Sequence, residues 1–328
     1  MKFILSCKAG SVSERGKKVA VIGAGVAGLG AAGYLYCRGY DIDVYDALPE
    51  AGGLLLFGIP DERLPKKGVI EGIDELKAAG VKFHLGIKVD SFKLEKIMES
   101  HDAVLIATGT WKAKSLRVPG ADLEGVITAL DFLVDNAKYR LGLSPILRKI
   151  YGTVGIMGGG YTAVDAVIEA MKWTDRIYVF YRRTIRESEA RSEWESIGRK
   201  GVRIIENSLV TRVIGTKSVE GVEVWGVKMK GDVPEFIPNS GTIFPLDFLL
   251  VAIGEESTPP ESIERLGIKV MDGRLLVDEN MMTSRYGVFA AGDVVNGPTF
   301  IGNALASGLK AAKAMDAFLN GELPWKGQ

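Results

Sequence analysis

Two glycine-rich segments, each directly behind a short apolar run, constrain the fold of this 328-residue chain. The first reads VAVIGAGVAGLGAAGYL over residues 19–35, and the second reads VGIMGGGYTAVDAV over residues 154–167. Such an apolar run predicts a buried parallel strand, and the small apolar residues after the glycine turn predict a helix. Two strand–turn–helix units about 135 residues apart predict an α/β protein with two Rossmann-like dinucleotide-binding domains.

The first segment has the spacing Gly23-x-Gly25-x-x-Gly28. Gly23 permits a tight turn, Gly25 lets the backbone approach a pyrophosphate, and Gly28 lets the helix pack close to the strand. The next predicted strand, residues 41–46, ends on Asp46, 18 residues after Gly28. Its carboxylate can accept hydrogen bonds from both ribose hydroxyls of an adenosine. The complete pattern predicts a dinucleotide site that suits FAD.

The second segment continues from Gly158 through Gly160 to Ala163, and a further strand ends near Tyr181. Two arginines, Arg182 and Arg183, follow this strand at the position that Asp46 occupies in the first unit. An acid there repels the 2′-phosphate of NADP, whereas an arginine fork binds it through charge-assisted hydrogen bonds. The position favours NADPH over NADH, and the alternative is a solvated basic turn.

Composition excludes several other classes of protein. The 41 basic residues balance 41 acidic ones, which gives no pull toward nucleic acid or an anionic membrane. The start of the chain lacks the roughly 7–15 apolar residues of a secretory signal, and no uncharged apolar run reaches the roughly 18 residues of a membrane span. We therefore expect a cytoplasmic protein.

Neither the cysteines nor the histidines suggest a metal site or a catalytic group. Cys7 and Cys37 cannot form a disulfide framework, a zinc site or an iron–sulfur cluster alone, and their low number argues for a reducing compartment. We expect Cys37, inside the first predicted helix, to pack in the protein core and Cys7 to lie in a mobile tail. His84 and His101 have polar neighbours and are expected at the surface. Hydride transfer to a flavin needs no side-chain base, so we assign no catalytic residue.

Several further segments resemble known flavoproteins. Residues 102–110, ending in Ala-Thr-Gly, and the Gly-Asp of residues 286–315 resemble proteins with two dinucleotide-binding domains. The segments GGLLLFGIPDERLPKKGV (52–69), LDFL (130–133), GGGYTAVDA (158–166) and YRRT (181–184) resemble the glutamate synthase small (β) subunit. Its relatives include the NADPH-binding subunit of the electron-bifurcating ferredoxin:NADP oxidoreductase and, more distantly, adrenodoxin reductase and thioredoxin reductase. The resemblance extends over residues 16–318.

The resemblance extends the set of cofactor-binding residues. Asp293 is expected to hold the ribityl and phosphate end of FAD, and the helix after Phe300 to point its N-terminus at the flavin. Glu193 matches a family acid near the nucleotide, or is a surface charge. The FAD residues are Gly23, Gly25, Ala27, Gly28, Asp46, Gly53, Leu54, Val89, Thr108, Gly109, Gly292, Asp293, Phe300 and Ile301. The NADPH residues are Gly158, Gly160, Tyr161, Thr162, Arg182, Arg183 and Glu193.

The resemblance implies an FAD domain of residues 1–112 and 273–328 that contains an inserted NADPH domain of residues 113–272. Family members usually carry an N-terminal domain with two iron–sulfur clusters, and only about 18 residues precede the first strand here, so we expect that domain to be missing. The Cys-x-x-Cys motif of thioredoxin reductases does not occur in the sequence.

The resemblance implies an FAD-containing NADPH oxidoreductase whose partner is an iron–sulfur protein, such as ferredoxin or a glutamate-synthase-like large subunit. One alternative is a stand-alone reductase or oxidase of a quinone, polysulfide or oxygen, and another is a non-catalytic nucleotide sensor. A homo-oligomer is left open. Leu56, Phe57 and Ile59 form either a docking rim or core, and Lys66 and Lys67 are candidates for attracting an acidic ferredoxin.

Overall fold

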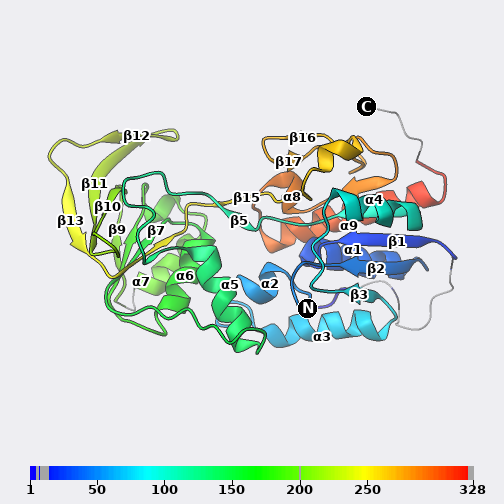
Figure 1. The fold of residues 1–328 in the computed structure, drawn as a ribbon, viewed down its shortest axis with the longest axis horizontal. Helices are drawn as coiled ribbons and strands as arrows, with labels where there is room; N and C mark the ends of the chain where they lie inside the picture. Colours follow the sequence, from blue (N-terminus) through cyan, green and yellow to red (C-terminus); the bar gives the residue numbers. More distant parts are fainter. Residues whose placement is uncertain (5–6, 8–14, 199–200, 324–328) are drawn as a thin grey trace. The chain divides into compact units, whose positions relative to one another are not determined.

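The computed structural model describes residues 1–4, 7, 15–198 and 201–323 (Figure 1). The chain divides into two compact units. Unit 1 comprises Met1–Leu56, Leu64–Lys112 and Glu255–Gln328, and unit 2 comprises Phe57–Arg63 and Ala113–Gly254.

Unit 1 is built on a parallel five-stranded sheet in the order β18-β4-β1-β2-β3. This is the strand order of a Rossmann fold. The strands are β1 (Lys18–Ile22), β2 (Asp41–Tyr45), β3 (Lys82–His84), β4 (Ala103–Ile106) and β18 (Val288–Ala290). The helices are α1 (Val26–Tyr36), α2 (Leu54–Phe57, whose last residue belongs to unit 2), α3 (Lys66–Ala78), α4 (Ser91–Ser100), η2 (Ile263–Leu266), α8 (Asp293–Asn296) and α9 (Ile301–Leu319).

Both faces of this sheet are covered, which explains why its strands are apolar throughout. On one face, Ala20 and Ile22 of β1 share a core with Leu94 of α4 and Leu266 of η2. On the other face, α1 packs closely enough that a side chain at Gly28 would contact Val21, and α9 lies against α1. The short strands β16 (Val270–Met271) and β17 (Arg274–Leu275) form a separate antiparallel pair.

Unit 2 repeats the plan with a parallel sheet in the order β9-β8-β7-β14-β6. Its strands are β6 (Val126–Thr128), β7 (Val154–Met157), β8 (Ile177–Phe180), β9 (Arg203–Ile205) and β14 (Phe248–Val251). Its helices are α5 (Ala129–Arg140), α6 (Tyr161–Ala170), η1 (Ile185–Glu187) and α7 (Arg191–Gly198). Between β9 and β14 the chain forms an antiparallel sheet of β10 (Ser208–Ile214), β11 (Gly221–Lys230), β12 (Val233–Phe236) and β13 (Thr242–Pro245).

The predicted fold class is confirmed: two Rossmann-like sheets are present, and one lies in a segment inserted into the other. The short strands β5 (Lys112–Ala113) and β15 (Glu255–Glu256) pair with each other where the chain leaves and re-enters unit 1. The units and the predicted domains share the boundary after Lys112. The second boundary of the units follows Gly254 rather than residue 272, because Ile263, Leu266 and Ile268 pack into the core of unit 1.

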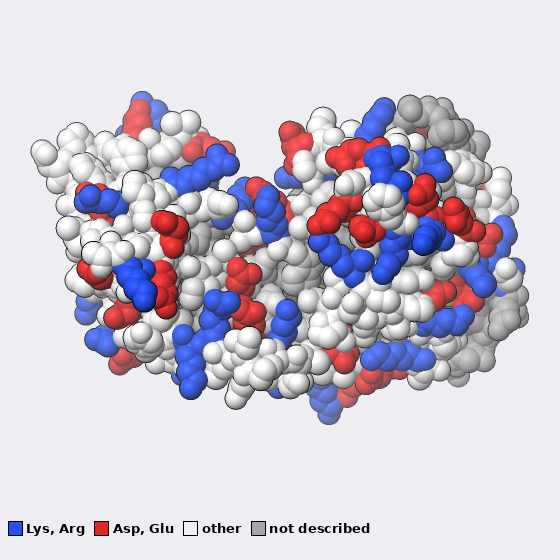
Figure 2. Space-filling model, viewed as in Figure 1, with Lys and Arg blue, Asp and Glu red and all other residues white. Residues whose placement is uncertain are grey.

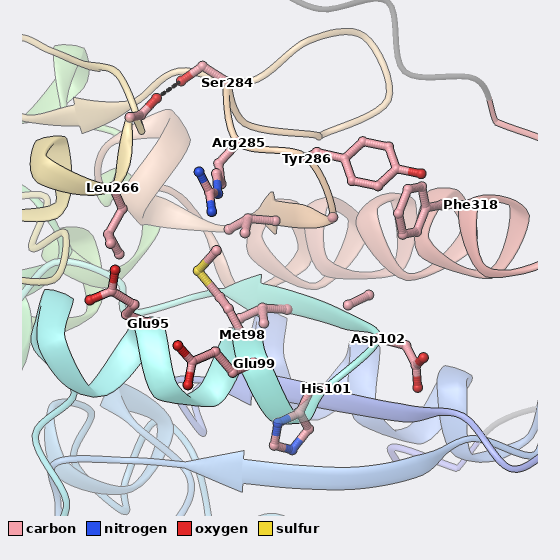
Figure 3. Close-up of a pocket in the computed structure, with 15 residues that line it drawn as sticks. Glu95, Met98, Glu99, His101, Asp102, Leu266, Ser284, Arg285, Tyr286 and Phe318 are labelled. Atoms are coloured by element: carbon pink, nitrogen blue, oxygen red, sulfur yellow. Dashed lines mark hydrogen bonds between the residues drawn. The ribbon is translucent and has the colours of Figure 1, made fainter.

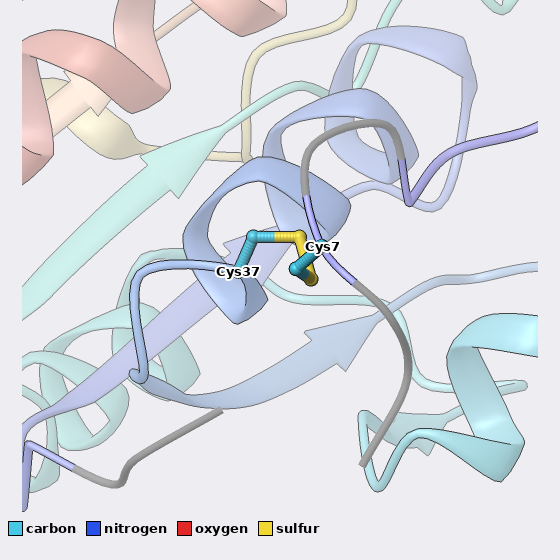
Figure 4. Close-up of a disulfide and its surroundings, with 2 residues drawn as sticks. All are labelled: Cys7 and Cys37. Atoms are coloured by element: carbon cyan, nitrogen blue, oxygen red, sulfur yellow. A yellow bond between two sulfur atoms is a disulfide. The ribbon is translucent and has the colours of Figure 1, made fainter. Parts of the chain in front are cut away.

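The N-terminal segment is docked, and its cysteine is bonded. Phe3 is 1% exposed, and its carbonyl oxygen lies 2.0 Å from the point where a Cβ would stand on Gly33 of α1. Cys7 forms a disulfide with Cys37, the residue directly after α1 (Figure 4). Cys37 is therefore not the core-packing thiol that was expected, and Cys7 is bonded to it rather than lying in a mobile tail.

The two histidines share one carboxylate. His84 Nε2 lies 2.5 Å and His101 Nε2 3.4 Å from oxygens of Asp43 on β2. The His101 side chain is only 6% exposed, so its expected place at the surface is wrong. Burial alone would raise the pKa of Asp43, but the hydrogen bonds from both histidines lower this pKa below its ordinary value.

Within the described part of the chain, no helix has the length and apolar character that a bilayer span requires.

The disulfide generates a prediction about stability. Cys7→Ser and Cys37→Ser should each lower the free energy of unfolding by about 2–4 kcal/mol, because the bond closes a loop between residues 30 apart in sequence. Denaturant unfolding of the apoprotein without reductant measures the loss. Dithiothreitol should destabilise the native protein to the same extent and leave both variants unchanged. A native protein that is insensitive to reductant would contradict the prediction.

Candidate functional site

The first glycine loop follows β1 at the carboxyl edge of the unit 1 sheet. A Cβ on Gly23, whose φ is +112°, would stand 2.2 Å from the carbonyl oxygen of Ala107, and one on Gly28 would stand 1.9 Å from that of Gly23. Neither position can carry a side chain. A Cβ on Gly25 would meet nothing within 4 Å. The loop is thus pinned at both ends and open in the middle, as a phosphate-binding turn requires.

Asp46, directly after β2, faces this loop. Its Oδ2 accepts a hydrogen bond from the backbone N–H of Ala24 (2.6 Å), and its Oδ1 accepts one from Leu48 (2.8 Å). A carboxylate offers about four acceptor positions, so capacity for ribose hydroxyls remains. Burial raises the pKa of Asp46 above its ordinary value, against the effect of the two backbone N–H groups.

The Ala-Thr-Gly turn after β4 lies beside the first loop and is held by Thr258. The backbone N–H of Thr258 donates to the Gly109 carbonyl oxygen at 2.9 Å, and its hydroxyl donates to the same oxygen at 3.0 Å. The Thr108 hydroxyl is buried and has no hydrogen-bond partner among the described residues. Such a group costs free energy unless a ligand satisfies it, which fits a polar cofactor here. Thr258 is not among the residues predicted from the sequence.

The Gly-Asp pair after β18 reaches the same edge. Gly292 has a φ of +76°, and a Cβ there would stand 2.9 Å from that of Ala27, so Ala27 serves close packing between α1 and this turn. Asp293 accepts a hydrogen bond from the Thr299 hydroxyl (2.6 Å), and burial raises its pKa. The turn and the first loop therefore lie together, as the FAD prediction requires.

The remaining predicted FAD residues differ in their surroundings. A Cβ on Gly53 would stand 2.8 Å from the Cα of Gly25, so this turn adjoins the loop and carries Leu54 with it. Phe300, the residue before α9, is 47% exposed, and Ile301 begins the helix. Val89 is 7% exposed, and its side chain packs in the core beside α4, which leaves its backbone as the group for a nucleotide.

The second glycine loop repeats the geometry in unit 2. A Cβ on Gly158 (φ +141°) would stand 2.1 Å from the Ala252 carbonyl oxygen at the end of β14, and a Cβ on Gly160 would meet nothing within 4 Å. Gly160 is the residue before α6, which begins with Tyr161 and Thr162. The free N–H groups of this helix terminus lie beside the open glycine, as a phosphate site requires.

Two side chains that were not predicted from the sequence hold the backbone of this loop through hydrogen bonds. The Ser188 hydroxyl (2.6 Å) and the Trp194 indole N–H (2.8 Å) both donate to the Gly159 carbonyl oxygen, and both side chains are buried. Glu193 neighbours Trp194 in the first turn of α7, where its carboxylate accepts a hydrogen bond from Ser192.

A third residue without a sequence signal, Arg63, ends the short segment Phe57–Arg63 that belongs to unit 2, while the chain on either side of this segment belongs to unit 1. Its guanidinium lies 2.7 Å from the carboxylate of Asp165 on α6 and 4.8 Å from the centre of the Tyr161 ring. The Asp165 side chain is only 7% exposed, so this is a largely buried pair. It places a cation at the N-terminal turn of α6.

Arg182 and Arg183 follow β8 and converge on one acceptor. Their Nη2 atoms lie 3.2 Å and 2.8 Å from Oδ1 of Asp232, in the turn between β11 and β12. Burial alone would lower the pKa of Arg183, but hydrogen bonds to Asp232 and Tyr181 raise this pKa above its ordinary value. The pair can therefore bind an anion at the predicted ribose position of the second dinucleotide.

The apolar side chains before and within the Gly-Ile-Pro segment were expected to form either a docking rim or core. Leu56 and Phe57 are 4% and 1% exposed, so the alternative that they are core is correct for these two residues, whereas Ile59 is half-buried. Lys66 donates to the Leu55 carbonyl oxygen (2.8 Å). Lys67 is 87% exposed and 3.8 Å from Glu71.

A cavity of about 540 Å³ lies at the opposite edge of the unit 1 sheet (Figure 3). Ala103 and Val288, which line it, begin β4 and β18, whereas the glycine loop lies at the carboxyl ends. None of the predicted cofactor residues lines this cavity. On the face shown in Figure 2, positive and negative side chains are interspersed.

Comparisons with known proteins agree with this architecture. The family model described as pyridine nucleotide-disulphide oxidoreductase matches residues 17–308. The glutamate synthase (NADPH) small chain of Halomonas elongata is 33% identical, over 93% of this chain and 68% of that protein. The NADP⁺-dependent formate dehydrogenase subunit beta of Moorella thermoacetica is 34% identical, over 93% of this chain and 44% of that protein. The structure of Mycobacterium tuberculosis FprA in complex with NADPH superposes with a TM-score of 0.71 at 17% identity, covering 95% of this chain and 87% of FprA.

The raised pKa of Asp46 generates a prediction about pH. An ionised carboxylate accepts stronger hydrogen bonds than a neutral one, so native protein should bind FAD about tenfold more tightly than Asp46→Asn at pH 7. This advantage is present above the pKa of Asp46 and is lost as pH falls through it, at a pH above the ordinary 3.8.

Fluorescence of released FAD, followed from pH 7 to pH 4, measures the ratio of the two affinities. Because both proteins contain Asp293, the ratio cancels the titration of that residue. A ratio of about one already at pH 7 would show that Asp46 does not hold the cofactor as an anion.

Proposed function

The chain belongs to the pyridine nucleotide-disulphide oxidoreductase family, in the branch of the glutamate synthase small chains, and we propose that it transfers hydride between NADPH and FAD and exchanges electrons with an iron–sulfur partner. Family membership makes it an oxidoreductase with FAD and NADPH as cofactors. The assignment of each cofactor to a unit, the contact residues and the partner belong to the proposal.

In unit 1, the residues fit FAD. Gly25 leaves space beside the start of α1, and Asp46 supplies the acceptor for a ribose. The buried Thr108 hydroxyl can donate a hydrogen bond to the cofactor. Asp293 is held by Thr299 at the same edge. When bound, FAD accepts a hydride as two electrons and can release them singly. The described residues bind and orient it, and none of them needs to act as an acid or base.

The convergence of Arg182 and Arg183 on one acceptor carries the assignment of NADPH to unit 2. The arginines follow Tyr181, which occupies the position of Asp46 in the repeated fold, and they can receive a 2′-phosphate. Gly160 and the N-terminus of α6 receive the pyrophosphate. Arg63 at the first turn of α6 adds a positive charge nearby.

The names of the relatives support a partner that carries electrons onward. A glutamate synthase small chain and a formate dehydrogenase beta subunit are each part of a larger assembly by name. The Gly-Ile-Pro segment and the second loop also resemble proteins that pass electrons to iron–sulfur centres. A stand-alone reductase of a quinone, polysulfide or oxygen is the competing function.

The arginine pair generates a prediction about nucleotide choice. Arg183→Ala should raise the Kd for NADPH about ten- to hundredfold, since a hydrogen bond to a charged group contributes about 1.5–3 kcal/mol. The Kd for NADH should change less than about twofold. Titration of flavin absorbance or calorimetry measures both constants, and Arg186→Ala, an exposed arginine on the same segment, is the matched control. Equal affinity of native protein for the two nucleotides would refute the assignment.

The electron partner can be tested in a steady-state assay. With NADPH and ferredoxins from the source organism, the rate should exceed the oxygen-only rate severalfold and fall as salt rises. Lys67→Glu should slow the ferredoxin reaction, whereas Lys96→Glu, an exposed lysine on α4, should not. Rapid turnover of a quinone or polysulfide with no ferredoxin or large-subunit reaction would favour the stand-alone reductase.

A further inference from the structure

A single carboxylate oxygen holds both arginines of the proposed 2′-phosphate site. Oδ1 of Asp232 accepts from Nη2 of Arg182 at 3.2 Å and from Nη2 of Arg183 at 2.8 Å. Guanidinium groups bind carboxylates and phosphates through the same charge-assisted hydrogen bonds. Asp232 therefore presents to the arginines the kind of anion that a 2′-phosphate would present.

The hairpin of β11 and β12 fixes the backbone of Asp232. Lys230 and Val233 pair across the ladder, so Gly231 and Asp232 form a two-residue turn. Gly231 has a φ of +61°, a value that glycine adopts readily in the first position of such a turn. Asp232 thus stays within reach of the end of β8 without a large movement of the chain.

The carboxylate can nevertheless leave the arginines easily. The Asp232 side chain is 82% exposed, and the arginine side chains are 39% and 29% exposed. Exposed ion pairs of this kind shift an equilibrium by only about one- to fivefold each. A dinucleotide that brings a phosphate of higher charge can displace such a carboxylate, which would then return to water by rotating its side chain.

We propose that Asp232 is an internal competitor of the 2′-phosphate of NADP(H): it occupies the arginine pair in the free protein and lowers the affinity for nucleotides that carry this phosphate. The inference rests on the proposed function, since it presupposes that the arginines recognise the 2′-phosphate. Nucleotides without this phosphate do not displace Asp232, so their affinity is independent of it. Asp232 then determines how strongly the protein prefers NADPH over NADH.

Binding of two small nucleotides tests the proposal without any turnover. The probes are 2′,5′-ADP, which carries the 2′-phosphate, and 5′-AMP, which lacks it, each titrated by calorimetry into the full-length flavoprotein. Asp232→Asn should bind 2′,5′-ADP about two- to tenfold more tightly than native protein at low salt, because two exposed ion pairs no longer compete. Its affinity for 5′-AMP should be unchanged, and the gain should shrink as salt rises.

Glu235→Gln is the matched control on the same hairpin. Glu235 lies on β12 and pairs with Lys230 at 2.5 Å, so its replacement removes a carboxylate from the hairpin without touching the arginine pair. This variant should bind both probes as native protein does. Thermal unfolding of both variants checks that neither substitution disturbs unit 2.

The outcomes separate this inference from the function on which it rests. If native protein prefers 2′,5′-ADP over 5′-AMP but Asp232→Asn gains no affinity, Asp232 is not a competitor and the inference alone is overturned. If Asp232→Asn binds 2′,5′-ADP more weakly, the carboxylate orders the arginines instead, which also overturns it. If native protein does not distinguish the two probes, the NADPH assignment itself fails.

Discussion

The close approach of a strand-end carbonyl to the first glycine of each loop is the constraint on which both nucleotide folds depend. In unit 1 the carbonyl oxygen of Ala107 excludes any side chain at Gly23, and in unit 2 that of Ala252 excludes any at Gly158. Each carbonyl follows the strand that neighbours the loop's own strand in the sheet. The neighbouring strand therefore fixes the turn, and the turn directs the helix N-terminus across the carboxyl edge where a nucleotide can bind.

The two units use one scaffold and differ in the charge that follows the second strand. After β2, Asp46 is turned inward and accepts two backbone N–H groups, which fixes its orientation before any ligand arrives. After β8, the arginines stand more exposed and are held by a side chain from a distant hairpin. The acid of the first unit is thus held by backbone groups, whereas the arginines of the second unit are held by an exposed carboxylate.

The sequence predicted those features that depend on neighbours along the chain. The glycine turns, the acid after β2 and the arginines after β8 follow from local spacing, and the predicted fold class followed from them. Features that depend on tertiary contacts were missed. The disulfide joins Cys7 to Cys37 across 30 residues, His101 contacts Asp43 on another strand, and Gly159 accepts a hydrogen bond from Trp194 on a later helix. The exit from unit 2 after Gly254 depends on which core receives Leu266, a choice that periodicity does not encode.

The membership of residues Phe57–Arg63 in unit 2 bears on how such proteins can recombine during evolution. A contiguous exchange of residues 113–254 would transfer both the glycine loop and the arginines but leave Arg63 behind. The transplanted fold would keep the buried carboxylate of Asp165 and lose its guanidinium, and removal of one partner from a buried pair costs about 3–5 kcal/mol. The seven-residue segment therefore supplies a charge partner that a contiguous transplant of the inserted fold would lack.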